Sequence, residues 1–151
     1  MMLLVAAMFA GATGWPTYAN ARFGYSICYP AAWKPQHEAD NSDGRKFVGA
    51  NGAELMVFGQ YAIDRSLAAW TADEVSAYTG KQGRITYRAG KANWLVLSGN
   101  DGATSLFYVK SVKRDDRFVT LQIKYPASQA ALFRPIVETL SRCLVVDRPP
   151  F

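Results

Sequence analysis

The sequence has few of the residues on which enzymes and metal proteins usually depend. It contains one histidine, His37, and two cysteines among 151 residues. Zinc sites use three or four His, Cys or carboxylate ligands, so these residues exclude an ordinary zinc centre. The phosphate-binding patterns GxxxxGKS/T and GxGxxG and the hydrolase pattern GxSxG are also absent. We therefore predict no catalytic, cofactor-binding or metal-binding residues.

Long hydrophobic runs are missing too. A membrane-spanning helix needs about 20 apolar residues, so none is predicted in the mature chain. Charged residues make up 19% of the chain and aromatic residues 13%, while half of all residues are hydrophobic. A disordered chain would carry more charge and fewer aromatic residues. The length suits a single globular domain.

The first segment has the pattern of a secretory signal peptide. Residues 1–19 carry no charged side chain, and residues 3–10 form an apolar run as long as the centre of such a peptide. Small residues favour cleavage after Ala12 or after Ala19. The alternative is a buried first strand or helix. With a signal peptide over residues 1–19, the protein is periplasmic or secreted, residues 20–146 form the domain and residues 147–151 a loose tail.

The charge is unevenly distributed along the chain. Residues 1–80 hold five basic and seven acidic residues, whereas residues 81–151 hold twelve basic and five acidic ones. A basic half favours an acidic protein partner or an anionic membrane surface. We expect no nucleic-acid partner, because an exported protein rarely meets nucleic acid. The alternative is a solvated basic face that only keeps the protein soluble.

Alternating apolar residues predict six to seven strands. The first covers residues 22–30, and residues 46–48 and 54–58 form a hairpin around Asn51-Gly52. Four more strands follow at hairpin spacing. They cover residues 84–88, 93–98, 105–113 and 118–125. The run Trp94–Leu97 is apolar on both faces, which predicts a central strand covered on both sides.

Two helices accompany these strands. Ser66 is the expected N-cap of the first, which Gly80 ends. The second lies near residues 128–144, where an apolar residue recurs every four positions from Leu132. Because Pro135 removes a backbone donor, we expect its main part to begin at Pro135, after a separate turn over residues 129–133. The predicted class is α+β with an antiparallel sheet.

Several short motifs carry a resemblance to a known family. They are RFGYSICYPAAW over residues 22–33, GRKF ending at Phe47, GAEL ending at Leu55, and Tyr125-Pro126 before the last helix. The chain resembles small exported bacterial proteins of the PsbP-like fold, shared by PsbP, the Ran-binding Mog proteins and the DcrB/LpqN lipoproteins. The resemblance covers most of residues 18–145. It implies an extrinsic subunit, binding module or accessory protein without a catalytic signature.

The two cysteines, Cys28 and Cys143, are candidates for a disulfide. An exported chain meets an oxidising compartment. Cys28 lies near the end of the first predicted strand and Cys143 near the end of the last helix, so the sulfurs meet if that helix covers the face to which Cys28 points. The alternative is two buried thiols.

A docking surface for an acidic partner is the second candidate site. If the polar faces of the last two strands align, Lys110 and Lys124 share one side of the sheet with Arg114 and Arg117. Trp33 is the best candidate for an exposed aromatic side chain. The alternative is a solvated sheet face with Trp33 covering the sheet.

Three function classes remain open. The sequence favours a non-enzymatic periplasmic binding or accessory module of unknown ligand. The first alternative is an immunity-type protein that neutralises a secreted bacterial toxin. The second is an envelope-acting hydrolase, for which His37 beside Glu38 would be the candidate base; a solvated loop histidine explains the same residues.

Overall fold

The computed structural model describes residues 14–147. The signal-peptide prediction falls mostly on residues 1–13 and the loose-tail prediction on residues 148–151, which lie outside the described residues. The first described residue of the predicted tail, Asp147, is anchored, since its N–H donates to the Gly24 carbonyl at 2.8 Å. No helix within the described range is long and apolar enough to cross a membrane.

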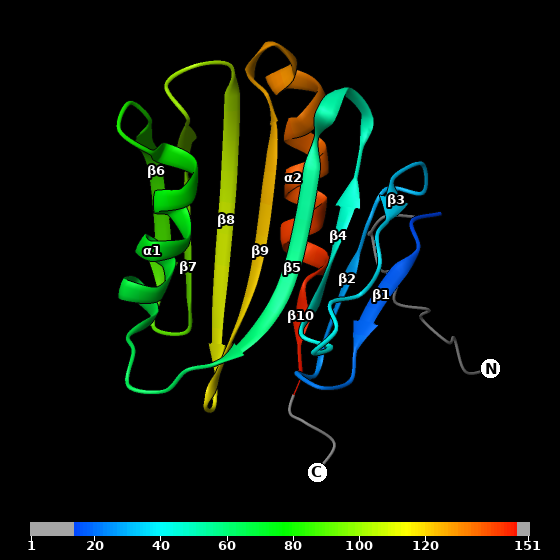
Figure 1. Cartoon of the computed structure of the whole chain (residues 1–151), viewed down its shortest axis with the longest axis vertical. Helices are drawn as coiled ribbons and strands as arrows, with labels where there is room; N and C mark the ends of the chain where they lie inside the picture. Colours follow the sequence, from blue (N-terminus) through cyan, green and yellow to red (C-terminus); the bar gives the residue numbers. More distant parts are fainter. Residues whose placement is uncertain (1–13, 148–151) are drawn as a thin grey trace, which may run out of the picture.

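The fold is α+β, as predicted, with two antiparallel sheets and two helices (Figure 1). The larger sheet has seven strands in the order β3-β4-β5-β9-β8-β7-β6. They are β3 (Lys34–Pro35), β4 (Gly44–Val48), β5 (Glu54–Tyr61), β6 (Arg84–Lys91), β7 (Trp94–Asn100), β8 (Ser105–Arg114) and β9 (Arg117–Pro126). The predicted hairpin and the four later strands are all present, because their alternation and turn residues agree. The 3-10 turn η1 (Ala50–Gly52) joins β4 to β5, and Asn51 there has a positive φ of 58°.

The smaller sheet has the order β1-β2-β10, and sequence patterns missed two of its strands. β1 (Thr17–Asn20) pairs with β2 (Tyr25–Cys28), and β10 (Val145–Val146) adds to the other side of β2. The single strand expected over residues 22–30 is therefore wrong at its start, because residues 21–24 form the turn between β1 and β2. Tyr18 and Asn20 of β1 are buried. Cleavage after Ala19 would remove three of the four β1 residues, whereas cleavage after Ala12 would leave β1 whole.

The first helix, α1 (Leu67–Thr79), has the predicted ends. Ser66 Oγ accepts a hydrogen bond from the Ala69 N–H at 3.0 Å, and Gly80 caps the other end with a φ of 51°. The helix covers one face of β7 and β8, with Val75 packed against Leu97 and Phe107. Trp70 stacks on Phe118 and donates to Thr120 Oγ1 at 2.9 Å.

The second helix, α2 (Ala130–Cys143), follows the 3-10 turn η2 (Ala127–Gln129) and runs unbroken through Pro135. The expectation that the main helix begins at Pro135 is therefore wrong. Ala131 and Pro135 are both exposed, so water reaches the Ala131 carbonyl that loses its helical donor. The apolar stripe of α2 is buried at Phe133, Val137 and Leu140, whereas Leu132, where the predicted four-residue repeat begins, is 58% exposed.

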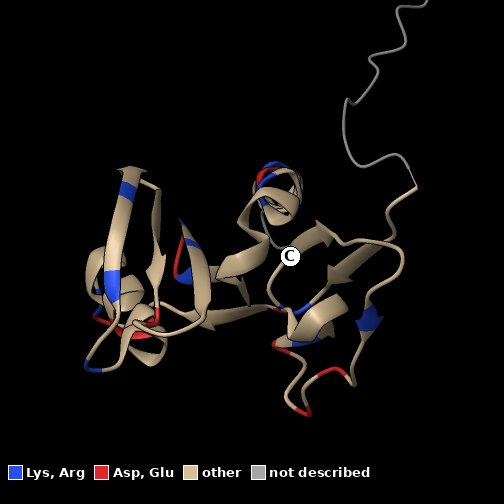
Figure 2. Ribbon diagram, turned by 90° about the horizontal axis from the view of Figure 1, so that it is seen from above, with Lys and Arg blue, Asp and Glu red and all other residues tan. Residues whose placement is uncertain are grey.

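The helices lie on opposite faces of the large sheet (Figures 1 and 2). α2 and the small sheet cover one face of β4, β5 and β9, and this is the larger core, with Phe47, Leu121 and Leu140 fully buried. α1 covers the opposite face of β7 and β8. Each helix therefore leaves part of its own face of the sheet uncovered.

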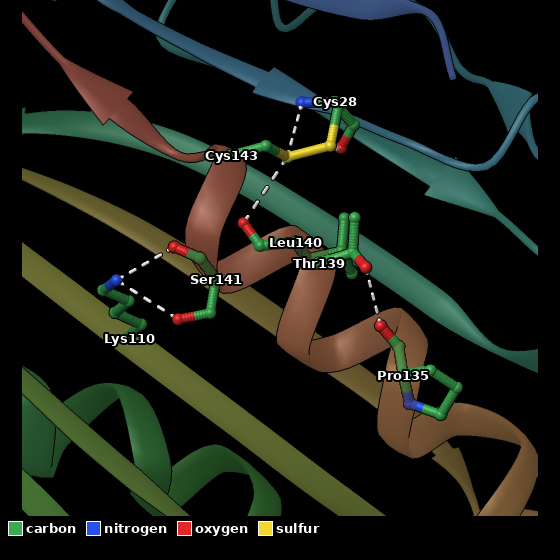
Figure 3. Close-up of a disulfide and its surroundings, with 7 residues drawn as sticks. All are labelled: Cys28, Lys110, Pro135, Thr139, Leu140, Ser141 and Cys143. Atoms are coloured by element: carbon green, nitrogen blue, oxygen red, sulfur yellow. Dashed lines mark hydrogen bonds between the residues drawn. A yellow bond between two sulfur atoms is a disulfide. The ribbon is translucent and has the colours of Figure 1, made fainter. Parts of the chain in front are cut away.

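The predicted disulfide between Cys28 and Cys143 is present, with the two Cα atoms 5.8 Å apart (Figure 3). The Cys28 N–H also donates to Cys143 Sγ at 3.0 Å. The bond joins the end of β2 to the end of α2 across 115 residues of sequence. It fixes the C-terminal end of α2 to the small sheet, and so fixes the side of α2 that faces the large sheet.

Candidate functional site

A groove opens where α2 stops covering the large sheet. It lies between α2 and the outer strands β6, β7 and β8, and has a volume of about 750 Å³. Contrary to the sequence expectation, β7 is not a central strand, although Leu95, Val96 and Leu97 are buried on its two faces as predicted. It is the second strand from the edge, with α1 on one face and this groove on the other. We call this site the α2 groove; its lining residues are Tyr87, Ala89, Trp94, Val96, Ser98, Tyr108, Lys110, Arg134, Val137, Glu138, Ser141 and Arg142.

The floor of the α2 groove follows from strand register. Ala89, Val96 and Lys110 are cross-strand neighbours on β6, β7 and β8, and Tyr87, Ser98 and Tyr108 form the next row. Neighbours in register point to the same face of a sheet. The floor is therefore a mixture of aromatic, small and basic side chains.

Lys110 lies where the floor meets α2 (Figure 3). Its ammonium donates to the Ser141 carbonyl at 3.0 Å and to Ser141 Oγ at 3.2 Å, and it lies 5.8 Å from the centre of the Trp94 ring. Tyr108 also donates to Ser141 Oγ, at 3.0 Å. Burial lowers the pKa of Lys110 from its ordinary value. An anion in the groove would therefore compensate a partly desolvated cation.

The α2 side of the groove carries Arg134, Glu138 and Arg142, which recur every four residues and so lie on one face of the helix. All three are exposed. Within residues 14–147, no ion pair joins Glu138 to either arginine. With Lys110, the groove lining holds three basic residues and one acidic residue, which gives it a positive balance.

The docking surface predicted from sequence does not form as a single face. Lys110 is opposite Leu121, and Lys124 is opposite Phe107, so the two lysines lie on opposite faces of the sheet. The reason is the two-residue turn Asp115-Asp116, which makes even-numbered residues of β8 neighbours of odd-numbered residues of β9.

Two other residues of that predicted surface are buried. Trp33 is 7% exposed and packs in the larger core, and its indole leaves no room for a side chain at Gly49. Arg117 is 2% exposed, and its guanidinium donates to the Asp147 carbonyl. Arg114, at the end of β8, is exposed. Of the five predicted residues, Lys110 alone lies in the α2 groove.

Sequence reasoning missed most of the α2 groove. Trp94 begins the run that predicts a strand covered on both sides, whereas its side chain is half-buried in the groove. Arg134 and Arg142 lie four residues on either side of Glu138, a spacing that indicates a basic helix face.

His37 lies at a different place, in a hollow of about 380 Å³ that it shares with Asp43 and Arg45. No group of three or more His, Cys, Asp or Glu side chains that could hold a metal ion occurs in the described part of the chain. Glu38, the carboxylate predicted beside His37, accepts a hydrogen bond from the Tyr18 hydroxyl at 3.0 Å.

No family model and no curated protein sequence matches this chain. Solved structures do. The chain is similar to the cyanobacterial PsbP protein CyanoP of Synechocystis sp. PCC 6803, with a TM-score of 0.68 at 14% identity, covering 95% of this chain and 99% of that one. It is also similar to LpqN of Mycobacterium tuberculosis, which is involved in cell envelope biogenesis, with a TM-score of 0.56 at 11% identity, covering 89% and 91%.

A third similar structure is a Pseudomonas aeruginosa protein of unknown function, described as a putative regulator. Its TM-score is 0.55 at 14% identity, and the match covers 89% of this chain and 98% of that one. At such identities the similarity shows the fold alone. The chain has the PsbP-like fold, as the sequence motifs indicated.

Proposed function

We propose that this PsbP-like domain is a non-enzymatic binding or accessory module of the bacterial envelope, and that it holds an acidic protein partner in the α2 groove. The observation that carries the proposal is the groove itself. It combines an aromatic floor and three basic side chains with an open mouth between α2 and the outer strands. Aromatic and arginine side chains are the residues enriched at protein interfaces.

The preference for an acidic partner rests on charge. The strands and helix that form the groove all come from residues 81–151, which carry a net charge of +7. Three of those basic residues line the groove, against Glu138 alone. Such an arrangement speeds the approach of an acidic partner and repels basic ones.

The envelope location rests on three observations. The disulfide between Cys28 and Cys143 suits an oxidising compartment. Residues 1–12 have a signal-peptide pattern that ends at Ala12, and cleavage there leaves β1 intact. LpqN, one of the structures with this fold, is involved in cell envelope biogenesis.

Site-specific photo-crosslinking in the native cell tests the proposal. A photo-reactive residue replaces Ala89, which lies half-buried in the groove. The matched control replaces Ala31, an exposed alanine on the loop between β2 and β3. We expect a discrete protein adduct from position 89 and none from position 31.

The charge dependence of that adduct separates a specific partner from a chance neighbour. Arg134→Glu with Arg142→Glu should abolish the position-89 adduct, because the change reverses the charge of the α2 side of the groove. Lys34→Glu, on the strand at the far edge of the sheet, should leave it intact. No adduct at position 89, or one that is indifferent to both arginines, would overturn the proposal.

A further inference from the structure

The outer strand β6 offers a second means of recognition beside the α2 groove. It ends the large sheet, and within residues 14–147 it pairs with β7 alone. Seven of its eight residues are exposed, including Ile85 at 49% and Tyr87 at 55%. An edge strand presents a row of unpaired N–H and C=O groups, to which another extended segment can add.

β6 pairs regularly with β7 only in its C-terminal half, which leads into the turn to β7. A bulge interrupts the register between Ile85 and Tyr87, whereas residues 87–91 pair without a break with residues 94–98 of β7. A bulge twists an edge strand and ends regular pairing there. An added strand would therefore pair with residues 87–91.

Both faces of this stretch have a hollow for the side chains of an added strand. Tyr87 and Ala89 line the α2 groove on one face. Arg88 and Lys91 line a hollow of about 480 Å³ beside the start of α1. Side chains of a strand alternate between the two faces. One set would meet the groove with Arg134 and Arg142, and the other would meet Arg88.

The charge of β6 determines which kind of extended segment can pair with it. Arg84, Arg88 and Lys91 are its charged residues, and all are basic and exposed. Figure 2 shows blue segments along the strands at this edge of the sheet. Basic side chains on an edge deter pairing with a second, equally basic copy of the strand. The same side chains attract an acidic segment.

We propose that an extended acidic segment of the protein partner adds to residues 87–91 of β6 as an eighth strand of the large sheet. This inference rests on the proposed function, since the same segment places alternate side chains in the α2 groove. Backbone hydrogen bonds to β6 hold the segment in place. A preference for acidic side chains comes from Arg88, Lys91 and the groove arginines.

Amide hydrogen exchange with a synthetic probe tests the inference. The probe is a peptide of glutamate alternating with valine, as long as the eight residues of β6. We expect the β6 amides that point away from β7 to exchange about tenfold more slowly at a peptide concentration ~10 times Kd. The same peptide with alternate backbone nitrogens methylated keeps its charges and cannot form the ladder, so it should give no protection.

A charge-reversed β6 provides the matched variant. Arg88→Glu with Lys91→Glu should abolish protection by the glutamate peptide and confer protection by a lysine–valine peptide. Protection by the methylated peptide, or the absence of β6 protection with the unmethylated one, overturns strand addition. Self-association of the protein through β6 in place of peptide binding overturns it as well.

The two proposals fail in different ways. If position 89 crosslinks a partner in a charge-dependent manner while β6 amides stay unprotected, the groove binds the partner and strand addition is wrong. If the β6 amides are protected from exchange but the position-89 adduct still forms after Arg134→Glu with Arg142→Glu, the groove proposal is wrong.

Discussion

The pKa of Lys110 depends on the environment inside the α2 groove. Its ammonium is half-buried, and burial lowers its pKa below the ordinary value of 10.5. A lowered pKa means that the fold disfavours the charged form. The resulting cost to stability is fully present below the folded pKa and disappears as the pH rises above the unfolded value.

We therefore predict that binding an acidic segment raises the pKa of Lys110. The charged groups that face the groove with it are Arg134, Glu138 and Arg142 of α2; tyrosines 87 and 108 lie on the floor. NMR titration of the Lys110 side chain, with and without the glutamate–valine peptide, measures the shift. Affinity should fall as the pH rises through this pKa. An unchanged or lowered pKa in the complex would contradict an anion near Lys110.

The burial of Trp33 gives a second test at this scale. A Cβ atom added at Gly49 would come within 2.4 Å of the Trp33 indole. We predict that Gly49→Ala lowers the free energy of unfolding by roughly 1–3 kcal/mol, the usual cost of overpacking a core. Urea denaturation followed by tryptophan fluorescence measures it. A variant as stable as the wild type would mean that Trp33 is free to move, as expected of an exposed aromatic.

At the scale of elements, the sequence predicts a strand wherever alternation and turn residues agree. The hairpin around Asn51-Gly52 and the cap of α1 at Ser66 are confirmed for that reason. β10 has two residues, and β3 also has two. Such short strands depend on tertiary pairing and leave no period to detect.

The site was harder to predict because it depends on which face each residue occupies. The two-residue turn Asp115-Asp116 sets the register of β8 and β9, and in that register the polar faces that would carry Lys110 and Lys124 do not align. The α2 groove depends further on where α2 stops covering β8. That boundary is set by packing between residues far apart in the sequence, such as Lys110 and Ser141.

The course of α2 through Pro135 yields a prediction at this scale. An alanine at this position would restore a donor to the Ala131 carbonyl and remove the ring that crowds the preceding turn. We predict that Pro135→Ala stabilises the protein by roughly 1 kcal/mol, less than the cost of a buried proline because the site is exposed. Thermal unfolding followed by circular dichroism should show a higher Tm. A lower Tm would mean that the proline fixes the entry of the chain into α2.

At the scale of the whole molecule, the disulfide ties the two ends of the domain together. It closes a loop of more than a hundred residues, which stabilises the fold by about 4–5 kcal/mol in the chain-entropy model. We predict that Cys28→Ser with Cys143→Ser lowers the free energy of unfolding by up to that amount. Urea denaturation measures it, and thiol titration of denatured, unreduced protein from the native cell should find no free thiol. Two free thiols per chain would contradict both the bridge and an oxidising compartment.

At this scale the basic half of the sequence, residues 81–151, supplies the β6–β8 edge and α2, as well as β9 and β10. The central claim is that the α2 groove, between α2 and the β6–β8 edge, binds an acidic partner. Once crosslinking has identified that partner, its Kd for the wild-type protein, Arg142→Glu and Lys34→Glu tests the claim most directly. We predict that Arg142→Glu weakens binding roughly tenfold, equal to about 1.4 kcal/mol, while Lys34→Glu binds as tightly as the wild type. Equal affinities for all three proteins, or a loss with Lys34→Glu alone, would contradict the claim.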